Sequence, residues 1–374
     1  MLNLPTPDLN ALAAAEQRQS RLTKPPGSLG RLEKLVLQLA AFQARPLPSA
    51  RPAAALVFAA DHPVTRHGVS PYPSAVTAAM LHNFREGGAA ASVLARACRV
   101  PLCIVDVGVA GVSELPTSSL SKGAVLRSDP FGSPSSFEVN APATAHSGVY
   151  VWRESVADST AGDLRVEDAM SEAVFEGCAA AGRRAVTRLG PLDVLIVGEI
   201  GIGNTTAAAA VCAALLGGDP GELVGAGTGA SGAMLETKRR VVTEAVQRVA
   251  DERSPLEILR RLGGREIAAA FGAIHAALEQ RSVVLVDGFV ISAAALALVR
   301  ANARALHGLV FSHLSGERGH ARVLAELGVQ PMLDLGLRLG EASGALAAYP
   351  LLEQACLLHS EMATFESAQV PDKA

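Results

Sequence analysis

The sequence is poor in aromatic residues, in net charge and in paired cysteines. Phe, Tyr and Trp make up 4% of the 374 residues, and the formal net charge is −3 at pH 7. So few rings argue against stacking platforms for bases, and so little charge points to neither nucleic acid nor an acidic membrane as a partner. The five cysteines form no C-x-x-C pair, which fits reduced thiols in a cytoplasm better than a disulfide framework.

Uninterrupted apolar runs and a secretory leader are missing as well. The stretch MLNLPTPDLN has no basic segment followed by an apolar one, so we expect no signal peptide. The two most apolar runs are interrupted by Glu199 with Asn204 and by Asp287 with Gly288, so we expect strands and helices there and no membrane span. What the sequence does have is 49% hydrophobic against 18% charged residues, which predicts a large packed core.

The order of apolar segments predicts an α/β protein. Residues 8–44 have helical spacing broken at TKPPGSLG, and RPLPSARP (45–52) is expected to be a linker. Short apolar runs then alternate with helical stretches, which indicates a doubly wound, Rossmann-like and mainly parallel sheet buried on both faces. Residues 113–150 are expected to be irregular, and the pattern is helical again from about 331. We expect strands at 54–61, 101–109, 193–200, 282–290 and 308–314, with a weaker one at 222–229.

Polar residues stand at the ends of several of these strands. In an open α/β sheet, ligands bind beyond the carboxyl ends of the strands, so these residues are the first candidates for a site. For any one of them, a helix cap or a loop anchor explains the residue equally well. They are Asp61, His62, Asp106, Glu199, Asp287, Ser312 and His313.

The segment GEIGIGNTT (198–206) places a glycine turn between a strand and an alanine-rich helix. Gly201 and Gly203 allow close approach of the backbone, and Asn204 with the threonines after it supplies caps or donors at a helix N-terminus that favours an anion. No Walker lysine follows, and these glycines do not have the G-x-G-x-x-G spacing. Glu199 ends the strand, where a carboxylate would repel a phosphate.

Three further segments carry polar groups without a decisive motif. The turn GAGTGAS (225–231), followed by Lys238, has amides for a phosphate or a ribose, or is a flexible loop before a basic helix. FSHLSGERGH (311–320) has hydroxyls and amides for a phosphate, but its adjacent Ser and His are expected to point to opposite faces, and no G-x-S-x-G elbow is present. In DHPVTRHGVSPYPSAVTAAML (61–81) the spacing matches no usual metal site, so we expect a loop that lines a pocket.

The segment LRLGEASGALAAYPLLEQA (337–355) puts Glu341 in a turn of small residues between helical stretches. A carboxylate with that much room reaches a ligand while partly desolvated, which would raise its pKa and suit it to general-base work. Helix capping is the alternative explanation from this segment alone.

Taken together, these segments resemble the nicotinate-nucleotide–dimethylbenzimidazole phosphoribosyltransferases of cobalamin biosynthesis. The likeness covers nearly the whole chain, and KPPGSLGRLE, GEIGIGNTT and RLGE-SGA in this order are its most specific parts. The matching segments are LTKPPGSLGRLE (22–33), AADHPVTRHGVSPYPSAVTAAM (59–80), VGEIGIGNTTAAAA (197–210), GAGTG (225–229), VLVDGFVISAAAL (284–296), FSHLSGERGH (311–320) and LDLGLRLGEASGAL (333–346).

The resemblance implies a reaction and an architecture. Nicotinate mononucleotide would give its phosphoribosyl group to a ring nitrogen of dimethylbenzimidazole, with inversion at the anomeric carbon, yielding α-ribazole phosphate and nicotinate. No cofactor and no metal are expected, because the pyridinium leaving group already carries positive charge. The family implies a cytoplasmic homodimer in which segments 1–45 and 331–374 form a small helical domain beside a large α/β domain of residues 52–330.

The family's functional residues carry over position by position. Its general base matches Glu341, its second active-site carboxylate matches Glu199, and its lysine matches Lys238. Glu199 then has a purpose, because a carboxylate stabilises the positive character that develops at the anomeric carbon as nicotinate leaves. The nucleotide is expected to bind Gly201, Gly203, Asn204, Thr205, Gly225, Gly227, Asp287, Gly288, Ser312, His313 and Ser315, and the acceptor base is expected to contact Tyr72, Val76, Met80 and Leu339.

The chain also departs from the family pattern. Pro63 stands where the family has a glycine in D-H-G-V and removes an N–H from that loop. Ala342 replaces the glycine after the general base, a small change unless φ is positive there. Tyr72 and Met80 stand where some members have small or amide side chains, so benzimidazoles, adenine-like purines and phenols stay open as acceptors. A nucleotide hydrolase and a non-catalytic nucleotide-binding protein are the alternative functions.

Overall fold

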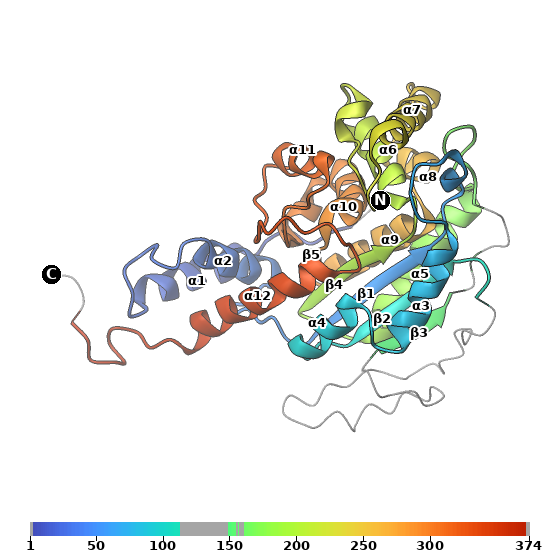
Figure 1. Ribbon diagram of the computed structural model, residues 1–374. Helices are drawn as coiled ribbons and strands as arrows, with labels where there is room; N and C mark the ends of the chain where they lie inside the picture. The colour runs from blue at the N-terminus through green and yellow to red at the C-terminus, as the bar shows by residue number, and fades with distance from the viewer. Residues whose placement is uncertain (1–2, 113–148, 155, 157–160, 372–374) are drawn as a thin grey trace.

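The computed structural model describes residues 3–112, 149–154, 156 and 161–371 (Figure 1). Within these residues, six parallel strands form one sheet in the order β3-β2-β1-β4-β5-β6. This is the order of a doubly wound Rossmann fold, which confirms the predicted α/β class. The strands are β1 (Ala53–Ala60), β2 (Leu102–Gly108), β3 (Val149–Arg153), β4 (Val194–Ile200), β5 (Val283–Val286) and β6 (Leu309–Phe311).

Helices cover both faces of this sheet. With the right-handed crossovers that parallel strands normally have, this strand order places α3 and α4 on one face, and α5, α9 and α10 on the other. Every residue of β1, β4 and β5 is buried as a result. The helices of the large α/β part are α3 (Ala75–Arg85), α4 (Ala90–Cys98), α5 (Glu172–Leu189), α6 (Asn204–Leu216), α7 (Gly232–Arg248), α8 (Pro255–Leu262), α9 (Arg265–Glu279), α10 (Gly288–Ala301) and α11 (Arg318–Glu326), with short 3₁₀ turns η1 (Pro63–His67), η3 (Pro220–Leu223) and η4 (Ala303–Gly308).

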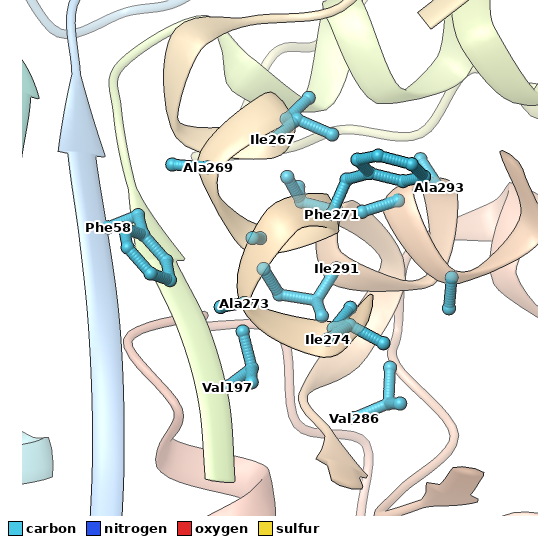
Figure 2. Close-up of a cluster of buried hydrophobic side chains, with 14 of the residues drawn as sticks. Phe58, Val197, Ile267, Ala269, Phe271, Ala273, Ile274, Val286, Ile291 and Ala293 are labelled. Carbon is cyan, nitrogen blue, oxygen red and sulfur yellow. The ribbon is translucent and has the colours of Figure 1, made fainter. Parts of the chain in front are cut away.

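The core is densest around α9. Figure 2 shows its side chains against Phe58 of β1 and Val197 of β4. Helix α9 also meets α5 so closely that a Cβ at Gly182 would lie 1.9 Å from the carbonyl oxygen of Ala269. Alanine and glycine line this contact because helices at this distance leave no room for larger side chains.

The two ends of the chain pack together. Helices α1 (Leu9–Arg21) and α2 (Arg31–Gln43) lie beside α12 (Ser343–Glu361) in Figure 1. The Arg18 guanidinium donates to the carbonyl oxygens of His359 and Ser360 at 2.6 and 2.7 Å. These bonds join the N-terminal helices to the C-terminal helix, as the predicted small helical domain requires. The predicted domain boundaries stay predictions. No helix within the described residues is long and apolar enough to span a bilayer.

Several expected elements are wrong in extent or type. The strand expected at 282–290 ends at Val286, because Gly288 has φ +48° and begins α10. The weaker strand expected at 222–229 is absent, since η3 and positive φ at Gly227 and Gly229 exclude extended backbone there. The helical pattern expected from 331 begins only at Ser343.

Two further expectations concern the segment 113–150. Residues 113–148, expected to be irregular, lie outside the described residues. Strand β3 begins at Val149, within the segment expected to be irregular, and the sequence analysis missed it although Val149–Arg153 reads VYVWR. The break between α1 and α2 at TKPPGSLG is confirmed.

Candidate active site

The candidate site lies where the strand order reverses, between β1 and β4, which we call the switch point. The chain leaves these neighbouring strands in opposite directions, so a crevice opens beyond their carboxyl ends. Gly201 follows β4 directly, and a Cβ there would lie 2.5 Å from the carbonyl oxygen of Ala60 at the end of β1. Only glycine lets the two backbones approach this closely.

Buried carboxylates gather at the switch point and form what we call the acidic half of the site: Glu199, Glu266, Asp287 and Glu341. They are 5%, 0%, 1% and 6% exposed, so water screens them little. Burial, followed by the charges of Glu266, Asp287 and Glu341, raises the pKa of Glu199 well above its ordinary value. A cationic ligand would therefore be stabilised here.

Glu341 is held directly beside Glu199. Its backbone N–H donates to the carbonyl oxygen of Glu199 at 3.0 Å. Its carboxylate accepts a hydrogen bond from the N–H of Ala91 at the start of α4, and Oε2 has no hydrogen-bond partner among the described residues. Burial raises the pKa of Glu341 to about 7, although the Ala91 hydrogen bond acts in the opposite direction. One oxygen is thus free to take a proton near neutral pH.

The turn that carries Glu341 is strained. Glu341 and Ala342 have φ of +64° and +63°, a region that L-residues seldom occupy, so an alanine at 342, where the resemblance implies a glycine, carries a conformational cost. A Cβ at Gly340 would lie 2.8 Å from Oε1 of Glu199, and one at Gly198 would lie 2.2 Å from the backbone nitrogen of Ala342. The turn therefore rests on the end of β4. The residues before it are irregular, so the expectation of helices on both sides is wrong.

Asp287 anchors α12 to the sheet. Its Oδ1 accepts the N–H of Ala345 in the first turn of α12 at 2.9 Å. This bond ties the start of α12 to the end of β5 and so fixes the Glu341 turn over β4. The predicted role of Asp287 in binding the nucleotide stays a prediction.

Two polar side chains flank the acidic half. Asn204, the first residue of α6, donates through Nδ2 to Oε2 of Glu199. His62 lies behind the glycine turn, with Nε2 2.6 Å from Oε1 of Glu266. Burial lowers the pKa of His62, but the Glu266 carboxylate outweighs it and raises the pKa above its ordinary value. A protonated His62 therefore offsets the charge of Glu266 within the acidic half.

A second group of residues forms what we call the glycine-loop half: Thr205, residues 225–229, Lys238, Ser315 and Glu317. The Lys238 ammonium donates to Oγ1 of Thr205 at 2.8 Å and to the carbonyl oxygen of Gly225 at 3.1 Å. It is 1% exposed, and burial lowers its pKa to about 8. Lys238 thus joins the start of α6 to the glycine turn, as a phosphate site would need.

Ser312 and His313 were expected to point to opposite faces, and this is wrong. The Ser312 hydroxyl donates to the carbonyl oxygen of Val286 at 2.7 Å, so its oxygen accepts from His313 Nδ1 at 2.9 Å. Since the serine proton is directed away from the histidine, the pair does not form an activated nucleophile. A Cβ at Gly288 would lie 3.5 Å from the His313 ring and 4.0 Å from Cβ of Ser315, so all of these residues share one corner.

The residues expected to bind the acceptor base lie on two segments. Val76 and Met80 are half-buried on α3, which is docked to the switch point because Oγ1 of Thr77 accepts the N–H of Ile202 at 3.1 Å. This places α3 beside the glycine turn after β4. Their contact with a base stays a prediction.

Tyr72 and Leu339 lie on the surface, 51% and 58% exposed. Their segments meet the glycine loop from two sides. Oγ of Ser70 lies 3.0 Å from Oγ1 of Thr228, and Arg338 donates to the carbonyl oxygen of Gly227 at 3.3 Å. The structure thus brings both segments to the rim of the same half of the site.

Three groups at the site were not predicted from the sequence. Glu266 stands in the first turn of the mostly apolar helix α9, after Gly263, Gly264 and Arg265, a signal that was available. Glu317 stands in a segment already noted, but received no role. The N–H of Ala91 has no sequence signal, because its position depends on how α4 docks. Among the described residues no cluster of His, Cys, Asp and Glu side chains is arranged to hold a metal ion.

The arrangement has a clear chemical sense. A buried acidic half is suited to stabilise a developing cation, a glycine-loop half with a buried lysine is suited to hold an anion, and both lie at the end of the sheet where ligands bind in α/β folds. A family model described as phosphoribosyltransferase matches residues 4–370. The chain belongs to this family.

Relatives within this phosphoribosyltransferase family are similar over nearly their whole length. The chain is 46% identical over 368 residues to a protein from Azotobacter vinelandii and 44% identical to one from Xanthomonas axonopodis pv. citri. Each match covers 98% of this chain and 96% of the relative, and both relatives are named nicotinate-nucleotide–dimethylbenzimidazole phosphoribosyltransferase. The crystal structure of CobT from Thermus thermophilus is 37% identical, has a TM-score of 0.83, and is matched over 100% of its length by 97% of this chain.

Proposed function

We propose that this phosphoribosyltransferase moves the phosphoribosyl group of nicotinate mononucleotide to dimethylbenzimidazole, giving α-ribazole phosphate and nicotinate. One observation carries the proposal: Glu341 is a buried carboxylate with a free oxygen and a pKa raised to about 7, fixed beside Glu199 at the switch point. The names of the relatives support the choice of substrates.

The proposed reaction is a displacement at the anomeric carbon of the ribose. The bond from that carbon to the pyridinium nitrogen breaks, and its electron pair goes to the nitrogen as neutral pyridine. One ring nitrogen of dimethylbenzimidazole attacks from the opposite face, which turns a β linkage into an α linkage. Glu341 takes the proton from the other ring nitrogen, so the product base is left uncharged.

The two halves of the site divide the nucleotide between them. Glu199 lies near the anomeric carbon or the ribose hydroxyls, where its charge stabilises the oxocarbenium-like transition state. Lys238 and the amides of the glycine loop hold the phosphate at a distance from that carboxylate. Tyr72, Val76, Met80 and Leu339 contact the acceptor base in this proposal.

The proposal extends to the organisation of the protein. Segments 1–45 and 331–374 form a small domain beside the large α/β domain of residues 52–330. The enzyme works as a homodimer in the cytoplasm, a location that fits five cysteines that are all free. Sedimentation of the full chain tests the dimer.

The test is a chromatographic assay of the full-length protein with nicotinate mononucleotide, with and without dimethylbenzimidazole. We expect nicotinate and α-ribazole phosphate to appear only with the acceptor, and Glu341→Gln to lower the rate about 100- to 10,000-fold. Glu361→Gln, at the exposed end of α12, is the matched control and should leave the rate unchanged.

Other outcomes point to the alternatives. Nicotinate released equally without acceptor would identify a nucleotide hydrolase. Binding of the nucleotide without turnover would identify a non-catalytic binding protein. Turnover with another azole, a purine or a phenol in place of dimethylbenzimidazole would keep the reaction and change the acceptor.

A further inference from the structure

Glu317 is a buried carboxylate to which the proposed reaction gives no role. It immediately precedes α11 and is 5% exposed, and its Oε1 accepts the N–H of Gly227 at 2.7 Å. Its Oε2 has no hydrogen-bond partner among the described residues and lies against Gly225, where a Cβ would be 2.3 Å away. A buried carboxylate of this kind is costly unless another charge offsets it.

Lys238 supplies that charge from the other side of the same turn. Its ammonium donates to the carbonyl oxygen of Gly225 at 3.1 Å, and a Cβ at Gly227 would lie 3.0 Å from Nζ. The turn 225–227 is therefore held between a carboxylate and an ammonium group through the same two glycines. No side chain at either glycine fits between them.

A chain of hydrogen bonds fixes Glu317 to α10. Its N–H donates to Oγ of Ser315 at 3.2 Å, and the N–H of Ser315 donates to His320 Nδ1 at 2.9 Å. Ser292 directs its own hydroxyl proton to the carbonyl oxygen of Gly288, so it accepts from His320 Nε2 at 3.0 Å. His320 is thus neutral, in agreement with a pKa lowered to about 3 by burial. Glu317 has little freedom to leave the turn.

We propose that Glu317 is a positioning residue that keeps the Lys238 ammonium charged and the 225–227 turn folded, so that both are ready for the phosphate of the nucleotide. This inference rests on the proposed function, in which Lys238 contacts that phosphate. Glu317 itself touches neither the substrate nor the reacting atoms.

The charges around Lys238 leave Glu317 as the partner that matters. Burial lowers the pKa of Lys238 to about 8, and the Glu317 carboxylate is the charge that acts against this. Helix α6, which packs against α7, carries no charged side chain. Other titratable or charged groups near α7 and the turn include Glu222 of η3, Arg66 and His67 of η1, Arg165 and Asp168, which bind Glu244 and Arg248 of α7, and Arg318 and Arg338 beside the turn.

The test measures the dissociation constant of ribose 5-phosphate by calorimetry between pH 6.5 and 9, on wild type and Glu317→Gln. Glutamine keeps an acceptor for the Gly227 N–H and removes only the charge. At pH 9 we expect the variant to bind about tenfold more weakly, because its Lys238 loses the proton at a lower pH. At pH 6.5 Lys238 stays charged in both, and the variant should bind as tightly as wild type or more tightly, since a negative charge has gone.

Two further variants test this crossover, in which Glu317→Gln binds more weakly than wild type at pH 9 but not at pH 6.5. Glu317→Gln combined with Lys238→Arg should bind without the loss at high pH, because a guanidinium stays charged throughout the range. Glu222→Gln removes a carboxylate that binds Arg322 at 3.1 Å on the exposed side of η3, and its curve should follow wild type.

The outcomes separate this inference from the proposed function. Weaker binding by Glu317→Gln at every pH would indicate a purely structural residue and overturn the proposal, as would coincident curves or no binding by wild type. A clear crossover in a protein that makes no α-ribazole phosphate would support the role of Glu317 and reject the proposed reaction.

Discussion

The acidic half and the glycine-loop half of the site bury charge in opposite ways. At the switch point, burial raises the pKa of Glu199 and of Glu341, and nearby carboxylates add to the rise. In the glycine-loop half, burial lowers the pKa of Lys238 while Glu317 acts against the fall. The acidic half concentrates four carboxylates, two of which have a histidine nearby, whereas the glycine-loop half sets one lysine against one carboxylate.

This difference matches the parts of the nucleotide that each half is proposed to hold. Repulsion among buried carboxylates is relieved when a cation develops, so the acidic half gains most in the transition state. A paired lysine is already organised before the ligand arrives, so the glycine-loop half contributes binding to ground state and transition state alike. Substitutions in the two halves should therefore have different kinetic signatures.

Among the substitutions that compare the two halves, Glu199→Gln is expected to have the largest effect. The amide keeps the shape of the side chain but removes the charge that stabilises the anomeric carbon, so kcat should fall roughly 100- to 1,000-fold. The KM for nicotinate mononucleotide should change little, because the ground state depends less on this charge. Steady-state kinetics with saturating dimethylbenzimidazole provide the measurement. A large rise in KM with kcat intact would contradict the idea that the acidic half acts mainly in the transition state.

Lys238→Met should show the reverse pattern with a smaller effect. Methionine occupies a similar volume without charge, so the dissociation constant of nicotinate mononucleotide should rise roughly 10- to 100-fold through the loss of a charge-assisted hydrogen bond. At saturating nucleotide, kcat should stay within a few-fold of wild type. The control is Arg239→Met, which should bind the nucleotide normally. Arg239 is the next residue of α7 and binds Glu236.

The sequence was sufficient to place Glu199, because strand ends in an α/β fold can be predicted from apolar runs. Knowing that β4 ends near residue 200 and that ligands bind beyond strand ends was enough to select this carboxylate. It was not sufficient to show that Glu266 approaches Glu199, since the two belong to elements whose contact depends on how α9 packs on the sheet. Motif segments identify residues, and packing decides which of them meet.

Backbone geometry was the other feature of the site that could not be predicted from the sequence. The sequence analysis noted that Ala342 matters only if φ is positive, and the sequence alone could not supply that angle. The bond between Ser312 and His313 was excluded by assuming regular extended backbone, which ends at Phe311. Local rules fail where strands turn into loops, and those are the positions at which this site is built.

Glu341→Gln should stabilise the protein at high pH. The pKa of Glu341 is about 7 in the folded protein against an ordinary value of 4.5, so the folded state binds the proton more tightly than the unfolded state. Stability is therefore lost as pH rises from 4.5 through 7, by up to about 3 kcal/mol at 1.4 kcal/mol per pKa unit. Urea unfolding at pH 5 and pH 8 should show the variant equal to wild type at the lower pH and more stable at the higher. An equal difference at both would contradict a strained, buried base.

The smallest effect is expected from Ala342→Gly, which introduces the glycine that the resemblance implies at this position of the turn. Glycine relieves the left-handed φ of +63°, a gain of about 1 kcal/mol. Against this, it removes a buried methyl group worth about 0.8 kcal/mol and adds freedom to the unfolded chain worth about 0.5 kcal/mol. The free energy of unfolding should therefore change by less than about 1 kcal/mol.

Ala342→Val provides the contrast at the same position. A β-branched residue is strongly disfavoured at positive φ. Its extra methyl groups would also press against Gly198, where a Cβ would already lie 2.6 Å from Cβ of Ala342. The variant should lose about 3 kcal/mol or more of stability, and kcat should fall with it because the Glu341 carboxylate moves. Urea unfolding and steady-state kinetics of both variants test this together. If valine were tolerated as well as glycine, the conformation of the turn would not be what fixes Glu341 over β4. The position of the Glu341 carboxylate would then depend on the bond between Asp287 and α12 alone.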